Sequence, residues 1–288
     1  MKAQKGQDEF SESEDSRRRC YGKRAFRLVA VQTGQRARLP GQKVPVFQLG
    51  VSAMTKNADK IIVALDVPTK KEALALVEQL REQISFFKIG LQLYTAEGPE
   101  IVRAVLATGA KVFLDLKLHD IPNTVARAVE SAAQLGAQML TIHLCGGSEM
   151  IRAAVNARSG DMLLLGVTML TSADERTLSE LGISDKIDNR VLRLARLGVG
   201  AGIGGLIASA LEVKMLRQQI GDKIKIVVQG IRPSWSDRND QKRVMTPREA
   251  LDSGADYLGI GRPITTHSSP RDAVSRILAE LAVQEIAR

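Results

Sequence analysis

Cysteine, histidine and aromatic residues are all scarce in this chain. Its 288 residues include two cysteines, three histidines and only 3% aromatics. Cys20 and Cys145 lie far apart, which argues against a disulfide framework or a cysteine-rich metal site and favours a reducing, cytoplasmic compartment. His119, His143 and His267 show no HExxH or HxxxH spacing, so the sequence predicts no metal site. With so few aromatics, the core must consist mainly of Ala, Val, Leu and Ile.

The chain also lacks a long apolar segment. Its first 25 residues carry five acids, where a secretory signal would need an apolar stretch. The uncharged run 197–211 is rich in glycine and too short to cross a bilayer. We therefore expect a protein that has no membrane partner.

Positive charge exceeds negative charge, but the excess is unevenly distributed. The formal net charge is +9, and residues 1–56 contain twelve Lys and Arg against five Asp and Glu. This segment therefore holds seven of the nine net charges, and the remainder of the chain is nearly neutral. A nearly neutral body gives no reason to expect a nucleic-acid partner.

Residues 1–56 differ from the rest of the chain in their pattern. They contain an acidic patch, the run Arg17-Arg18-Arg19 and scattered glycine and proline, with no sustained hydrophobic period. Such a segment cannot bury enough apolar surface to offset the entropy lost on ordering. We expect a disordered N-terminal extension, or a start codon assigned upstream of Met54. A basic arm for RNA or membrane is the alternative, which the lack of interleaved aromatics disfavours.

The region 57–288 alternates short apolar runs, rich in β-branched residues, with longer stretches of helical period. Segments 71–84 and 272–286 place apolar residues on one helical face, and Pro122 and Pro247 stand where helices would begin. Eight strands that alternate with helices predict an α/β protein, a (β/α)₈ TIM barrel, with a doubly wound open sheet as the alternative. The expected strands are 61–67, 86–90, 111–118, 139–144, 163–170, 205–210, 225–231 and 257–264.

Residues 200–205 match the glycine-rich fingerprint of dinucleotide-binding proteins. That fingerprint binds pyrophosphate only where a strand leads into a helix. Here a helical stretch, 187–197, precedes the glycines and a strand follows them. We therefore expect a tight connection from helix to strand and no dinucleotide cofactor.

Charged residues gather at the carboxyl ends of the predicted strands. Asp66 closes the first strand, Lys88 lies in the second, Asp115 and Lys117 end the third, and Arg262 ends the eighth. Buried strands disfavour charge unless it is paired, and TIM barrels place their active sites at this rim. Each residue alone is compatible with a structural ion pair, but together they predict an active site.

The third strand leads into the segment DLKLHDIPNT at 115–124. A period of two points Asp115 and Lys117 the same way, while the leucines beside them face the helices. Asp120 follows on the loop. Carboxylates beside an ammonium favour its charged form, which can deliver a proton or stabilise a developing carbanion.

The seventh and eighth strands end in segments that combine glycine with arginine. These are Gln229-Gly230-Ile231-Arg232 and Gly259-Ile260-Gly261-Arg262. The loops after these two strands are a frequent phosphate site in TIM barrels. Glycine amides can approach phosphate oxygens closely, and arginine can bind them with two parallel hydrogen bonds. A phosphate site is therefore favoured over a plain turn beside a surface arginine.

These motifs closely resemble the orotidine 5'-phosphate decarboxylase family across residues 59–286. Besides 115–124, the resemblance is carried in order by ALD ending at Asp66, FKIG at 87–90, VTMLTS at 167–172, GIRP at 230–233, DQKR at 240–243 and IGRP at 260–263. The resemblance implies decarboxylation of orotidine 5'-phosphate to UMP, without metal or organic cofactor. One departure is Val228-Gln229-Gly230, where many bacterial members have Thr-Pro-Gly.

The resemblance also implies a role for each matching residue. Lys117 would protonate C6 of the pyrimidine as CO₂ departs, with Lys88, Asp115 and Asp120 completing a network of alternating charge. Asp66 and Thr124 would hold ribose hydroxyls, Thr171 would lie against the pyrimidine, and the phosphate would bind at Arg232, Gln241, Gly261 and Arg262. Because Asp120 and Thr124 of this family reach the neighbouring subunit's site, a homodimer is implied. The implied substrate-binding set is Asp66, Lys88, Asp115, Thr124, Thr171, Arg232, Gln241, Gly261 and Arg262.

Two other functions remain open. A magnesium-dependent hexulose-phosphate synthase or keto-gulonate-phosphate decarboxylase shares the DxKxxD signature, but Lys88 and the HDIPNT and DQKR segments disfavour it. A non-catalytic protein that binds RNA through residues 1–56 is the other, and intact Asp115, Lys117 and Asp120 argue against it.

Overall fold

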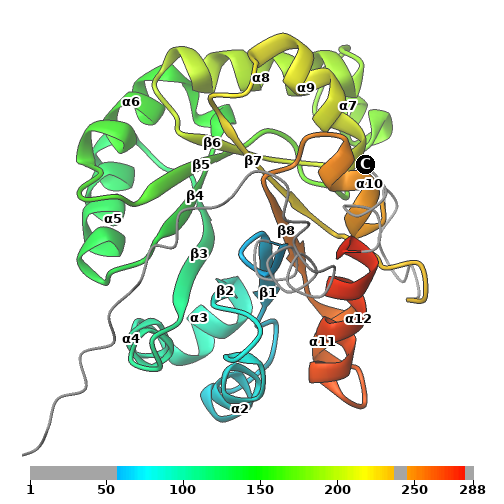
Figure 1. The fold of residues 1–288 in the computed structure, drawn as a ribbon. Helices are drawn as coiled ribbons and strands as arrows, with labels where there is room; N and C mark the ends of the chain where they lie inside the picture. The colour runs from blue at the N-terminus through cyan, green and yellow to red at the C-terminus, as the bar shows by residue number, and fades with distance from the viewer. Residues whose placement is uncertain (1–56, 237–244, 283–288) are drawn as a thin grey trace, which may run out of the picture. The chain divides into compact units, whose positions relative to one another are not determined.

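The computed structural model describes residues 57–236 and 245–282 of the chain. In this part, eight parallel strands close into a barrel in the order β1 to β8, and β8 pairs with β1 (Figure 1). The predicted (β/α)₈ barrel is therefore confirmed, and the alternative of an open sheet is wrong. The predictions made for residues 1–56 lie outside the described residues.

Every predicted strand is present, and most end earlier than expected. Asp66 lies two residues beyond β1 rather than closing it, and Arg262 begins a short helix rather than ending β8. Asp66 is excluded from β1 because the pairing of β1 with β2 stops at Ala64, which lies opposite Lys88. The strands are β1 (Ile61–Ala64), β2 (Phe86–Gly90), β3 (Lys111–Leu118), β4 (Met139–His143), β5 (Leu163–Val167), β6 (Gly205–Ala208), β7 (Lys225–Gln229) and β8 (Tyr257–Ile260).

Helices connect the strands and surround the barrel (Figure 1). They are α2 (Lys70–Leu80), α3 (Leu91–Glu97), α4 (Glu100–Leu106), α5 (Pro122–Gln134), η1 (Leu144–Gly146), α6 (Gly147–Ala157), α7 (Glu175–Glu180), α8 (Ile187–Gly200), η2 (Ala210–Glu212), α9 (Val213–Ile220), α10 (Pro247–Asp252), α11 (Arg262–Thr265) and α12 (Pro270–Ala282). The side chains of Thr69, Asp174 and Thr246 cap α2, α7 and α10 by accepting free backbone N–H groups. None of the described helices is long and apolar enough to cross a membrane.

The glycine-rich segment 200–205 joins a helix to a strand, as predicted. Helix α8 ends at Gly200, and β6 begins at Gly205. Pro122 and Pro247 are likewise the first residues of α5 and α10, where a missing N–H has no cost.

Two apolar layers hold the barrel together. The larger, mostly aliphatic layer lies between strands and helices. Inward-facing residues form a separate cluster that fills the barrel: Ile62, Phe86, Phe113, Met139, Leu165, Val167, Ile207 and Val227. Because strand side chains alternate, the residues two positions further along these strands point into the carboxyl end of the barrel. The apolar cluster therefore closes the barrel below the space in which a site could lie.

Candidate active site

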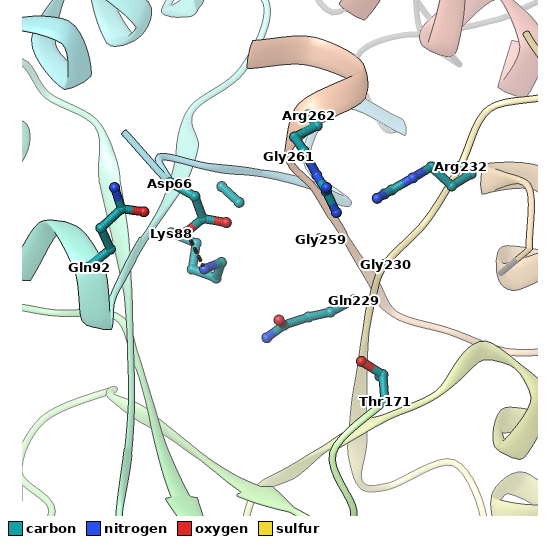
Figure 2. Close-up of a pocket in the computed structure, with 11 residues that line it drawn as sticks. Asp66, Lys88, Gln92, Thr171, Gln229, Gly230, Arg232, Gly259, Gly261 and Arg262 are labelled. Carbon is teal, nitrogen blue, oxygen red and sulfur yellow. Dashed lines mark hydrogen bonds and ion pairs between the residues drawn. The ribbon is translucent and has the colours of Figure 1, made fainter. Parts of the chain in front are cut away.

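A cavity of about 480 Å³ lies at the carboxyl ends of the strands. Ala64, Lys88, Gln229 and Gly259 each stand two positions after an inward-facing apolar residue, so strand alternation directs them to this mouth. The residues that line the cavity are Ala64, Asp66, Lys88, Gln92, Thr171, Gln229, Gly230, Arg232, Gly259, Gly261 and Arg262 (Figure 2).

Four charged side chains form a row of alternating sign at one side of the cavity. Lys88 Nζ lies 3.0 Å from Asp66 Oδ1 and 3.6 Å from Asp115 Oδ2. Lys117 Nζ lies 2.8 Å from the same oxygen of Asp115. The Asp115 side chain is 1% exposed, whereas that of Asp66 is 53% exposed. The row thus passes from the open cavity through the buried Asp115 to Lys117, which is 24% exposed, and it joins residues in or just after the first three strands.

The balance of interactions at Asp115 favours its charged form in spite of its burial. Burial alone would raise the pKa of this carboxyl, but the charges of Lys88 and Lys117 and hydrogen bonds from Lys117 and Thr141 bring the pKa below its ordinary value. Thr141 Oγ1 donates to Oδ1 at 2.9 Å, and Gln229 Nε2 donates to Oδ2 at 3.2 Å. A carboxylate with this many donors is held firmly, and it positions the Lys117 ammonium.

Lys117 has a left-handed backbone with φ 52°, which no other non-glycine residue shares in the part of the chain that the structure describes. The register between β3 and β4 shifts between Leu114 and Leu118. Thr141 Oγ1 accepts the Lys117 backbone N–H at 2.8 Å, replacing a bond of the interrupted ladder. Bulges of this kind redirect side chains next to functional sites. The predicted pairing of Lys117 with Asp115 is therefore present, but it depends on a distortion that simple alternation does not predict.

Gly90 leaves the space in which Asp66 and Lys88 meet. A Cβ atom at this position would lie 3.0 Å from Lys88 Nζ and 3.1 Å from Asp66 Oδ1. A side chain at this position would therefore require the ends of Lys88 and Asp66 to shift by a few tenths of an ångström.

Two arginines define another end of the cavity. Arg232 follows β7 and Arg262 begins α11, and Figure 2 shows their side chains pointing toward one another. The Arg232 residue is 6% exposed, and its backbone N–H donates to Met245 O at 3.0 Å. Guanidinium groups that converge on one space are suited to an anion with several oxygens. Gly261 lines the same space, so these three predicted phosphate residues lie together.

Comparison with known proteins settles the family. A model described as the orotidine 5'-phosphate decarboxylase / HUMPS family matches residues 59–277. The chain belongs to this family. The resemblance inferred from the motifs is thereby confirmed.

Several relatives of this decarboxylase family are similar over nearly their whole length. The orotidine 5'-phosphate decarboxylase of Opitutus terrae is 48% identical over 224 residues, which cover 77% of this chain and 97% of the relative. That of Heliobacterium modesticaldum is 42% identical over 233 residues, covering 78% of this chain and 96% of the relative. A crystal structure of the Lactobacillus acidophilus enzyme of the same name has 34% sequence identity and a TM-score of 0.68, covering 77% of this chain and 99% of its own.

Four described residues that the family resemblance assigns to the site are not among those that line this cavity. Asp115 and Lys117 are connected to it through Lys88, whereas Asp120 and Thr124 are not. Asp120 and Thr124 are both exposed, and neither lines the cavity. The Asp120 carboxylate accepts the Ile121 backbone N–H at 2.6 Å. Among the described residues of this chain it forms no ion pair with Lys117, whose partner is Asp115. Gln241 lies outside the described residues.

Three polar residues contact the site without having been predicted as part of it. Gln229, noted in the sequence as the start of the glycine–arginine segment after the seventh strand and as a departure from the family pattern, lines the cavity and binds Asp115. Gln92 lines the cavity from the first turn of α3. Thr141 lies in β4 and binds both Asp115 and Lys117. Its position two residues after the inward-facing Met139 is the signal that alternation offers for it.

His119 and His143 lie near this rim with ring centroids 5.8 Å apart. Burial and the neighbouring charges of His119 and Lys117 lower the pKa of His143, against an opposing effect of Asp115. Within 57–236 and 245–282, no three His, Cys, Asp or Glu side chains are grouped so that they could hold a metal ion.

Proposed function

We propose that the chain is a carboxy-lyase that converts orotidine 5'-phosphate to UMP and CO₂ in pyrimidine biosynthesis. The observation that carries the proposal is the row Asp66–Lys88–Asp115–Lys117. Its first two members line the same cavity as the converging Arg232 and Arg262. A fixed row of charge suits a reaction in which charge develops on one atom, and two arginines suit a phosphate monoester. The names of the relatives support the same activity.

Lys117 acts on the carbon that loses CO₂. The bond between C6 and the carboxylate breaks, and its electron pair stays on an sp² carbon that has no electron sink. An ammonium held beside that carbon stabilises the transition state more than the ground state, and its proton then passes to C6. Asp115 holds the ammonium at 2.8 Å. Lys117 is left neutral and regains a proton from water, and no step uses a metal or an organic cofactor.

The remaining side chains bind the parts of the substrate that do not react. The half-exposed Asp66 carboxylate accepts hydrogen bonds from ribose hydroxyls, and Thr171 lies against the pyrimidine. Arg232, Gly261 and Arg262 hold the phosphate, together with Gln241 from outside the described residues. Binding energy from this distant phosphate can be used to orient the substrate and exclude water at C6.

Asp120 and Thr124 complete the active site of a second copy of the chain. Both side chains are exposed, and neither lines the cavity of its own chain, which supports this assignment. They flank Ile121, which is 66% exposed, while Leu91 and Leu170, which follow β2 and β5, are 55% and 44% exposed. These exposed apolar side chains follow β2, β3 and β5 on the same rim of the barrel, and they favour a protein contact there. In a symmetric dimer each copy offers the same surface, so each Asp120 can reach the partner's site.

The decisive experiment is a spectrophotometric assay with orotidine 5'-phosphate in the presence of EDTA. We expect full turnover, because the proposed steps need no metal. Turnover that EDTA abolishes, or activity on hexulose or keto-gulonate phosphates instead, would support the magnesium-dependent alternative. A folded protein without turnover that binds RNA in a salt-dependent manner would support the non-catalytic alternative.

A further inference from the structure

A second cavity adjoins the phosphate end of the candidate active site. Its volume is about 300 Å³, and it is lined by Trp235, Ser236, Arg262, Pro263, Thr266, His267 and Arg276. Arg262 lines both cavities. The two cavities therefore meet at this side chain.

The lining of this second cavity is cationic. It contains two arginines and one histidine, and no carboxylate is among its described residues. Its two hydroxyls already donate to backbone carbonyls, Ser236 to Pro233 O and Thr266 to Arg262 O. The donors that face a ligand are thus supplied mainly by cations, a combination that favours an anion of high charge.

Arg276 and His267 are held in place by Trp235. The guanidinium carbon of Arg276 lies 4.3 Å from the centroid of the indole ring. A guanidinium stacked by its face keeps the N–H groups of its edge available for an anion. The His267 ring packs edge-on against the same indole at 5.8 Å, and the Ser269 backbone lies 3.0 Å from its Nδ1. Because these side chains are already held in place, they lose less conformational entropy when a ligand binds.

We propose that the second cavity binds the terminal phosphoryl group of a nucleoside 5'-diphosphate. The first phosphate of that ligand lies between Arg232 and Arg262, and the second reaches Arg276. The inference rests on the proposed function, because the uridine 5'-monophosphate part of the ligand binds where UMP would. Uridine 5'-diphosphate is then a competitive inhibitor. It contacts Arg276, which the substrate and the product do not contact.

The test compares two ligands on matched variants of the full chain. UMP and uridine 5'-diphosphate are titrated calorimetrically into the wild-type protein, Arg276→Ala and Arg271→Ala. Arg271 lies on the same helix but pairs with Glu82 and does not line the cavity. We expect Arg276→Ala to weaken the diphosphate about tenfold, the effect of one charge-assisted hydrogen bond. Binding of UMP, and both ligands on Arg271→Ala, should change less than about twofold on the same scale.

Each remaining outcome decides between the two proposals. If Arg276→Ala weakens both ligands equally, or neither, the second cavity is not a phosphoryl site. If the wild-type protein neither binds UMP nor turns over orotidine 5'-phosphate, the proposed function fails first and the inference with it. Arg276→Gln keeps the length of the side chain, and its thermal unfolding alongside the wild type ensures that a loss of binding is not a loss of fold.

Discussion

Lys117 is the residue on which the proposed chemistry depends most directly. We expect Lys117→Ala to lower the rate of decarboxylation by at least about 10³-fold, since both proton donation and electrostatic stabilisation are lost. Binding of UMP should persist, because we propose that Arg232 and Arg262, which line the cavity, hold the phosphate away from the reacting carbon. Single-turnover absorbance with orotidine 5'-phosphate and calorimetry with UMP measure the two effects separately. Substantial turnover in Lys117→Ala would remove Lys117 as the proton donor.

His143 makes the stability of the protein depend on pH. Burial, His119 and Lys117 lower its pKa from the ordinary 6.5, so the unfolded chain takes up a proton at this site before the folded protein does. The free energy of unfolding therefore falls as the pH drops from about 6.5 through the folded pKa. We expect His143→Asn to lose less melting temperature than the wild type between about pH 7.5 and about pH 5.5. Equal losses in the two proteins would contradict this account.

Some residues of the candidate site could be predicted from the sequence, and others could not. Asp66, Lys88 and Asp115 could be predicted because a charge in or beside a buried strand is unusual and demands a partner. Gln229 and Thr141 do not stand out by residue type, because neutral polar residues occur in strands for many structural reasons. Strand alternation alone points Thr141 toward the site. The backbone of Lys117 could not be predicted. Its bulge arises from how β3 pairs with β4, and the Thr141 hydroxyl that stabilises it lies 24 positions away.

Strands and helices follow the hydrophobic period closely, whereas their ends do not. The alternation of apolar runs with helical stretches predicted all eight strands because each strand is buried on both faces. Where a strand ends depends on how far its neighbours continue to pair. Asp66 and Arg262 fall just beyond that point, and they are thereby free to turn into the cavity rather than follow the ladder.

The turn between α10 and β8 allows a prediction about packing at one glycine. Gly254 has φ 105°, and a Cβ there would lie 2.9 Å from Arg217 Cγ. Arg217 cannot move easily, because it donates to Gly254 O at 2.8 Å and Ile224 O at 2.7 Å and pairs with Asp256. We expect Gly254→Ala to lower the free energy of unfolding by about 2–3 kcal/mol, combining backbone strain with overpacking.

Gly221 is the matched control for this substitution. It also has a left-handed backbone, with φ 74°, but nothing lies within 4 Å of a Cβ at that position. Gly221→Ala should therefore cost only the strain, about 1 kcal/mol. Urea unfolding of both variants measures the difference, and equal effects would show that Arg217 yields to the new methyl group.

At the scale of the whole molecule, closure of the barrel brings distant parts of the chain together. The β1–β8 pairing aligns residues 61–63 with 258–260, and the charged row meets the arginines only because of it. Sequence motifs could indicate that these residues share a rim. They could not give the cavity itself, because its shape depends on all the strands at once.

The proposed dimer can be tested by mixing two inactive proteins. Lys117→Ala and Asp120→Ala should each be inactive as homodimers, because every site lacks one member of the charge network. In a mixed dimer, one site receives an intact lysine from one chain and an intact aspartate from the other. We expect activity to return in proportion to the fraction of mixed dimer after subunit exchange. If mixed dimers form and stay inactive, Asp120 acts within its own chain or not at all.

The left-handed backbone at Lys117 has a consequence for the stability of variants. A non-glycine residue with φ 52° costs about 1–2 kcal/mol that glycine would not incur. Lys117→Gly should therefore unfold at higher urea concentration than Lys117→Ala, although neither variant can donate a proton. Against wild type the comparison differs, because Lys117 also pairs with the buried Asp115 carboxylate at 2.8 Å, and removing one partner of a buried ion pair is destabilising. The backbone strain at position 117 and the ion pair with Asp115 thus act on stability in opposite directions, at the residue that we propose as the proton donor.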